Sequence, residues 1–131
     1  MVVIVNHNSY YRKEIQAMSK YTTVMGDLLS ELPRFDFKKA VDEFKGDNRV
    51  RTLGCFDLLK SMLYGQIIGA YSIREIESSL EANGNQLYHG GMKRVKRSTL
   101  CDAMEKRDHR IFEQTFLSLV EKASCIAGKH G

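Results

Sequence analysis

Basic side chains gather in one short segment of this 131-residue chain, and their chemistry suits a polyanionic partner. Residues 86–110 contain seven basic and three acidic side chains, so this segment holds the whole formal net charge of +4. The basic residues are Lys93, Arg94, Lys96, Arg97, Lys106, Arg107 and Arg110. Lys and Arg neutralise phosphates and release counterions from nucleic acid, so this concentration of charge indicates a nucleic-acid surface. A solvated helix face is the plainer interpretation, and composition alone gives the two about equal weight.

Two hydroxyl residues, Ser98 and Thr99, follow the basic run at the predicted start of a helix. Hydroxyl groups and the free amides of a helix N-terminus both suit phosphate oxygens. A helix predicted at 72–82 precedes this one at 98–107, which is the order of a helix-turn-helix, whose second helix enters the major groove. Such turns usually have about 3–4 residues. The connection here spans 83–97, so we expect a variant or a short extra helix near Asn85–His89.

The residues predicted to contact DNA combine this basic run with both predicted helices. Arg97 and Thr99 would approach bases or phosphates, the lysines would hold the backbone, and Arg74 would reach a phosphate from the preceding helix. The full set is Arg74, Lys93, Arg94, Lys96, Arg97, Ser98, Thr99, Lys106 and Arg107.

Other groups that could do chemistry give only weak signals. Three carboxylate pairs at helical spacing could bind Mg²⁺, but such pairs are common on solvated helices: Asp27/Glu31, Glu77/Glu81 and Asp102/Glu105. No GxxxxGK[ST], GxSxG or HExxH motif occurs. Three widely spaced cysteines and four scattered histidines give no zinc-ligand spacing. We therefore expect no catalytic residue, no metal or other cofactor site and no small-molecule substrate in this chain.

Helical periodicity predicts the elements that must position these residues. With 43% hydrophobic and 27% charged residues, the chain can form one domain with a buried core. Residues 1–20 have no clear period and are predicted to be a loose N-terminal extension, whereas 21–128 are predicted to form a single helical domain. Predicted helices cover 22–32, 36–45, 52–70, 72–82, 98–107 and about 109–127. The expected fold is an all-α compact bundle of five to six helices with a helix-turn-helix-like pair. No signal peptide or membrane span is apparent, so we expect a cytoplasmic protein without membrane contact.

Local signals predict where several of these helices begin and end. Pro33 stops the first helix, Asp36 is the expected N-cap of the second, and Gly46 its C-cap. Further signals are a capping box at Ser72/Glu75 with a Tyr71/Ile76 staple, a second capping box at Thr99/Asp102, and close helix approach at Gly65/Gly69.

Several stretches of residues 24–112, in order along the chain, are similar to one bacterial family. They are LLSELP (28–33), FKKAV (37–41), VRTLGCFD (50–57), SIREIE (72–77), LYH (87–89), VKRSTL (95–100) and DAMEKRDHRIF (102–112). They resemble the N-terminal domain of bacterial insertion-sequence DDE transposases of the insertion-sequence-four-like group, which is a domain of unknown function. The last two stretches are the most specific. The family usually has an aromatic residue, most often Trp, where this chain has His109.

The resemblance implies a role in DNA transposition beside a separate catalytic domain. That RNase H-like domain carries carboxylates that hold two divalent metal ions. We expect this chain to stop before it, and so to lack the DDE residues and the metal. By analogy, the domain would help to recognise the DNA ends of the mobile element.

Three functions therefore remain open for this chain. The first is a transposase DNA-binding domain. The second is a module for protein interaction or dimerisation, because the predicted 109–127 helix carries seven apolar residues that could exceed what a small core needs. A homodimer would present paired half-sites to inverted DNA ends. The third is a decayed transposase fragment without a cellular function.

Overall fold

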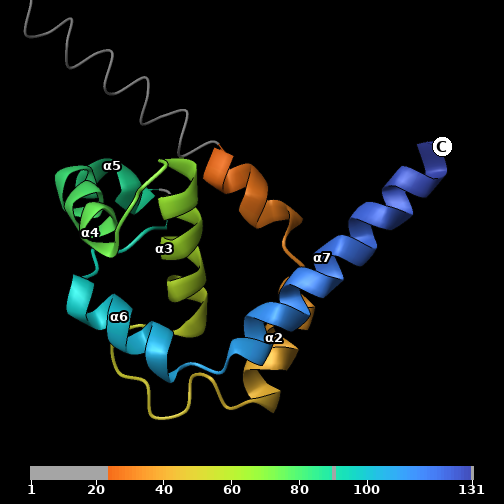
Figure 1. Cartoon of the computed structure of the whole chain (residues 1–131), viewed down its shortest axis with the longest axis horizontal. Coiled ribbons are helices and arrows are strands. Elements are labelled where there is room, and N and C mark those ends of the chain that lie inside the picture. The colour runs from red at the N-terminus through yellow and green to blue at the C-terminus, as the bar shows by residue number, and fades with distance from the viewer. Residues whose placement is uncertain (1–23, 90, 131) are drawn as a thin grey trace, which may run out of the picture.

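The computed structural model describes residues 24–89 and 91–130, apart from the side chains of His89 and His130. The predicted 1–20 extension and the start of the predicted 22–32 helix lie outside the described residues. The described chain is all-helical, as predicted, and contains no strand. A first helix over 24–31 is followed by α2 (Arg34–Glu43), α3 (Cys55–Ile67), α4 (Ile73–Ala82), α5 (Gly84–His89), α6 (Arg97–Lys106) and α7 (His109–His130) (Figure 1).

The short helix α5 fills most of the long connection between α4 and α6. The expectation of an extra helix near Asn85–His89 is therefore confirmed, and α5 is the element missing from the predicted helix set. Helices α4 and α6 contact each other, and both also contact α3. The predicted helix-turn-helix-like pair thus packs as a pair, with α5 inserted in its connection.

The larger core lies between α3, α4, α5 and α6. Tyr64, Leu80, Leu87 and Leu100 are its largest fully buried side chains, and the Tyr64 hydroxyl forms a hydrogen bond with Ser79 Oγ across α3 and α4. The two helices approach closely at Gly65, where a Cβ atom would lie 2.5 Å from Ile76 Cδ1. The predicted close approach is confirmed at this glycine.

Gly69 has a different role from Gly65, because it ends α3 in a left-handed conformation. Its backbone φ is 70°, a value that residues other than glycine rarely adopt. A Cβ atom at this position would meet nothing within 4 Å. The amide of Ala70 donates to the Gly65 carbonyl at 2.9 Å, which completes the end of the helix. The expected close packing at Gly69 is therefore wrong, and the turn explains this glycine.

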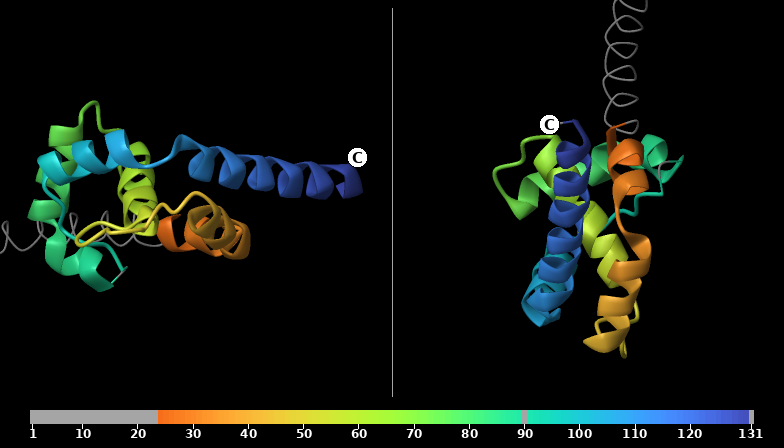
Figure 2. Two further views of the ribbon diagram at one scale, coloured as in Figure 1. Left: turned by 90° about the horizontal axis from the view of Figure 1, so that it is seen from below. Right: turned by 90° about the vertical axis from the view of Figure 1, so that its right-hand side faces the viewer.

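A second, smaller core joins α2, α7 and the start of α3. The Phe37 ring lies 5.9 Å from Phe56 and 6.4 Å from Phe112, measured between centroids. Cys55 and Ile111 are completely buried beside these rings. Two views show α2 alongside the first part of α7 (Figures 1 and 2).

The ends of α2 differ from the prediction. Its N-cap is Pro33, and Asp36 lies in the first turn without capping the helix. Its C-cap is Phe44, after which Lys45 takes the left-handed conformation with φ of 52°. Gly46 follows, donating its amide to the Val41 carbonyl at 2.9 Å. Packing explains this glycine, since a Cβ atom would lie 2.5 Å from Ile111 Cδ1.

The two predicted capping boxes have different outcomes. At α4, Ser72 Oγ accepts the Glu75 amide at 3.2 Å, while Glu75 Oε2 accepts the Tyr71 amide at 2.7 Å. The Tyr71 side chain is 96% exposed, so the predicted hydrophobic staple does not form. At α6, the helix already begins at Arg97 and no side chain caps it. The predicted Thr99 cap is therefore wrong.

Helix α7 leaves the body of the molecule about halfway along its length (Figures 1 and 2). Its first half is anchored by Ile111 and Thr115, which are both buried. Lys122 Nζ pairs with Glu31 Oε2 at 2.9 Å, which connects α7 to the first helix. Residues 120–129 are all exposed.

Candidate nucleic-acid interface

The start of α6 presents the predicted DNA-contacting residues to solvent. Leu100 and Ala103 are buried and fix one face of the helix against the core. Lys96, Arg97 and Ser98 are exposed, and Thr99 is half-buried. No side chain caps this N-terminus, and no acid lies in its first turn. Its free amides can therefore donate to an anion, which the positive end of the helix dipole also attracts.

The extended segment 92–96 brings further cations to this end of α6. Met92 and Val95 are buried, so the residues between them point outward. Lys93 Nζ pairs with Asp57 Oδ2 at 3.0 Å. Burial alone would raise the pKa of Asp57, but the hydrogen bonds from Lys93 and Lys60 outweigh it and lower that pKa. Lys93 is thus partly neutralised within the molecule.

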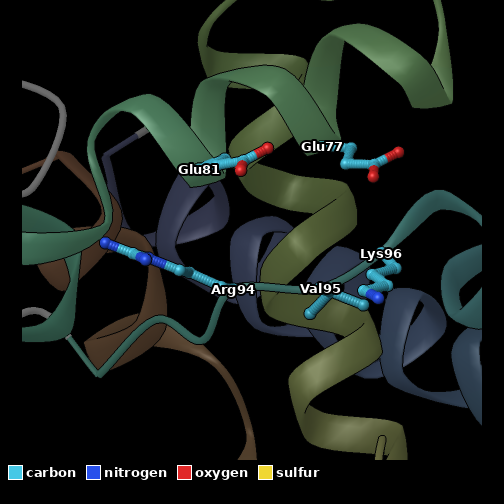
Figure 3. A pocket seen from close by; sticks show the side chains of 5 residues that line it. All are labelled: Glu77, Glu81, Arg94, Val95 and Lys96. Carbon is cyan, nitrogen blue, oxygen red and sulfur yellow. The ribbon is translucent and has the colours of Figure 1, made fainter.

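A pocket of about 330 Å³ separates this basic segment from α4. Figure 3 shows Glu77 and Glu81 on α4 at one side, with Arg94 and Lys96 on the other and pointing away from each other. No ion pair joins the two sides among the residues that the structure describes. The Arg94 guanidinium lies over Gly84, where any side chain would collide with it. The two carboxylates therefore border the basic side chains Arg94 and Lys96 without forming an ion pair with them.

Lys106 and Arg107 lie at the opposite end of α6, about 14 Å along the helix axis from Arg97. Lys106 pairs with Asp102 at 2.9 Å. Arg107 is half-buried, and its Nη2 donates to the Leu53 carbonyl at 2.8 Å. Its Nε is buried without a hydrogen-bond partner in the described part of the chain. The predicted set therefore divides between the two ends of α6, with Arg74 exposed in the first turn of α4.

Three basic residues outside the predicted set lie near Lys106 and Arg107. Lys45, Arg49 and Arg51 line a cleft together with the C-terminal end of α6. Their own segment, 45–51, contains three cations and one acid, which is a visible but weak charge signal. The sequence does not show that they share a cleft with the end of α6. The fold does, because it places this turn beside residues more than fifty positions later in the chain.

Near this end of α6, Arg110 and Asp108 pair with each other and the Cys55 thiol is buried. Arg110 Nη2 binds Asp108 Oδ2 at 2.7 Å, and hydrogen bonds from Arg110 lower the pKa of Asp108 to about 2. Cys55 is buried, and burial together with its contact to Asp47 raises its thiol pKa to about 12. A neutral, enclosed thiol is not a nucleophile.

One comparison with known proteins gives a match. The model of a family described as a domain of unknown function, DUF4372, matches residues 20–93. The chain belongs to the DUF4372 family. The DUF4372 match covers the helices through α5 and ends at Lys93, the first residue of the basic run, so the resembling stretches at 95–100 and 102–112 lie beyond it. The comparisons with curated proteins and with solved structures give no match.

Two further properties concern the described residues alone. None of their helices is both long and apolar enough to cross a bilayer. They also contain no cluster of three or more His, Cys, Asp or Glu side chains that could hold a metal ion.

Proposed function

We propose that this chain is the DNA-binding domain of an insertion-sequence transposase and contacts the ends of the mobile element. The observation that carries the proposal is the exposed basic strip of Arg94, Lys96 and Arg97 around the uncapped start of α6. Membership of DUF4372, together with the resemblance to the N-terminal domain of insertion-sequence-four-like transposases, supports the connection to transposition.

In this proposal α6 is the helix that enters the major groove. Arg97 and Ser98 reach outward from its first turn, while Thr99 lies closer to the body and suits a phosphate at the helix start. Lys93 and Lys96 hold the backbone, and Arg74 contacts a phosphate from α4. In this proposal the chain has no catalytic residues of its own. The divalent metal ions are bound by a separate catalytic domain, and the protein acts in the cytoplasm.

The first experiment measures binding of the purified chain to random duplex DNA by fluorescence anisotropy while salt is varied. Nonspecific affinity of about 10⁻⁴–10⁻⁶ M that weakens steeply with salt would support phosphate contacts, and DNA from element ends would then test specificity. The double variant Lys96→Ala/Arg97→Ala should reduce the salt slope by about two, one for each lost contact. Unchanged binding by this variant would contradict the proposal.

Two control variants make this test more specific. Lys38→Gln/Lys39→Gln removes the same charge from exposed positions on α2, where neither lysine forms an ion pair with a described residue. It should leave the salt slope nearly unchanged. Glu77→Gln/Glu81→Gln removes the carboxylates beside the strip and should strengthen binding, because like charges no longer repel the DNA phosphates.

The exposed apolar face of α7 favours a second function, association with another copy of the chain. Phe116 is 63% exposed, Leu117 56% and Val120 44%. These residues face away from Ile111 and Thr115, which contact the body. Association through α7 is compatible with DNA binding, because a two-fold dimer would bring two copies of α6 to paired half-sites.

A further inference from the structure

The cleft between the 45–52 turn and the C-terminal end of α6 has the composition of an anion site. It has a volume of about 580 Å³ and is lined mainly by polar groups of these two segments. Lys45, Arg49 and Arg51 are exposed at its edge. The side chains of these three residues form no hydrogen bond or ion pair with any residue that the structure describes.

The fold holds this turn in a fixed position. Gly46 packs against Ile111 and Cys55, and Asp47 Oδ1 accepts the Cys55 amide at 2.7 Å. The amides of Asn48 and Val50 donate to the carbonyls of Lys45 and Asp47 at 3.2 and 3.3 Å. The three cations therefore project from an ordered turn attached to the smaller core.

The acids around the cleft already have partners. Asp102 pairs with Lys106 at 2.9 Å, and Asp108 pairs with Arg110 at 2.7 Å. They leave the charges of Lys45, Arg49 and Arg51 uncompensated. Arg107 also lines the cleft, and its buried Nε has no acceptor among the described residues. Arg107 forms no ion pair with a described residue, so its guanidinium adds a fourth positive charge to the lining of the cleft.

We infer that this cleft binds a phosphate of the DNA backbone and forms a second anchor at the far end of α6. The inference rests on the proposed DNA binding. Helix α6 has ten residues and is about 15 Å long, whereas the major groove is about 12 Å wide. Cations at both ends of such a helix can contact the two phosphate backbones that flank the groove. The basic strip would hold one backbone, and the cleft would hold the other.

The test compares wild type with Arg49→Asn/Arg51→Gln on the same duplex DNA over a range of salt concentrations. Asn is chosen at position 49 because φ there is 60°, a conformation that Asn tolerates. The salt slope should fall by about one, for the one phosphate contact that is lost, while the matched Lys38→Gln/Lys39→Gln control should stay close to wild type. Circular dichroism melting would show that both variants are folded before their binding is compared.

The outcomes separate this inference from the proposed function. If Lys96→Ala/Arg97→Ala weakens binding while Arg49→Asn/Arg51→Gln binds like wild type, the cleft is not an anchor and DNA binding stands. If wild type does not bind DNA at low salt, both ideas fail together.

A second readout uses amide NMR shifts of residues 45–52 and distinguishes backbone phosphate from free phosphate. Shifts on adding duplex DNA that inorganic phosphate does not reproduce would support a DNA anchor. Saturation by inorganic phosphate that DNA does not displace would overturn it.

Discussion

Arg107 shows how one residue of the basic segment takes a structural role as well. It continues the buried stripe of α6, since positions 100, 103 and 107 lie on the same helical face. Its guanidinium is therefore directed toward the body and reaches the Leu53 carbonyl. A count of charges along the sequence cannot distinguish such a residue from Arg97, but the i, i+3, i+7 spacing can.

Replacing Arg107 by Ala should destabilise the fold. The change leaves the Leu53 carbonyl without its charge-assisted hydrogen bond, and a loss of about 1–3 kcal/mol is expected. Urea unfolding followed by circular dichroism measures it. Arg97→Ala is the control. Because Arg97 is exposed, this variant should unfold at the same urea midpoint as wild type. Equal midpoints for both variants would show that the Arg107 contact is not stabilising.

The three cysteines should differ in reactivity toward a thiol reagent at pH 8. Cys101 and Cys125 are exposed, whereas Cys55 is buried with a pKa raised to about 12. Two thiols per chain should react quickly and the third only on unfolding. A raised pKa stabilises the fold below the ordinary thiol value of about 8.5, and this contribution is lost as pH rises toward 12. Fast reaction of three thiols in the folded chain would contradict the buried position.

At the scale of elements, close helix contacts decide which glycines can be replaced. Gly65→Ala should destabilise the protein by about 1–3 kcal/mol, because its methyl group would lie 2.5 Å from Ile76 Cδ1. Gly26→Ala is the matched control in the 24–31 helix, since nothing lies within 4 Å of its added Cβ. Alanine has the higher helix propensity, so this control should gain up to about 1 kcal/mol. Melting temperatures that fall for Gly65→Ala and rise for Gly26→Ala would confirm the α3–α4 contact.

Most helices could be predicted from the sequence because their signals are local. The Ser72/Glu75 capping box is such a signal: Ser72 Oγ accepts the Glu75 amide as predicted, and the Glu75 carboxylate accepts the amide of Tyr71, one residue before the N-cap. The start of α6 could not be predicted in this way. Val95 and Leu100 are both buried there, and their packing allows the helix to begin at Arg97 without the Thr99 cap. Tertiary contacts outweighed local propensity at this point.

The candidate site could be predicted only in part for a related reason. Lys96 and Arg97 are neighbours in the sequence and are both exposed at the start of α6, although the Arg94 side chain points away from Lys96 (Figure 3). The cleft residues Arg49 and Arg51 come from a distant turn, and only the packing of that turn beside α6 brings them near Lys106. Charge clusters assembled from separate segments are not visible in a sliding count along the chain.

At the scale of the whole molecule, the projecting half of α7 predicts concentration-dependent association. Phe116 and Val120 lie on its exposed apolar face. Light scattering after size-exclusion chromatography should show a dimer at micromolar concentration, and Phe116→Ser/Val120→Ser should be monomeric. Lys129→Ala is the control, because it alters an exposed position beyond this face. A wild-type chain that stays monomeric over the whole concentration range would contradict association through α7.

The two-residue connection between α6 and α7 makes these helices mechanically coupled. Arg107 is fixed to the turn before α3, and Asp108 is fixed to Arg110 in the first turn of α7. Lys122 pairs with Glu31 in the exposed half of α7, so this helix is also connected to the first helix. A partner bound to α7 would therefore be held in a defined orientation relative to α6, because both residues of the connection are fixed by hydrogen bonds.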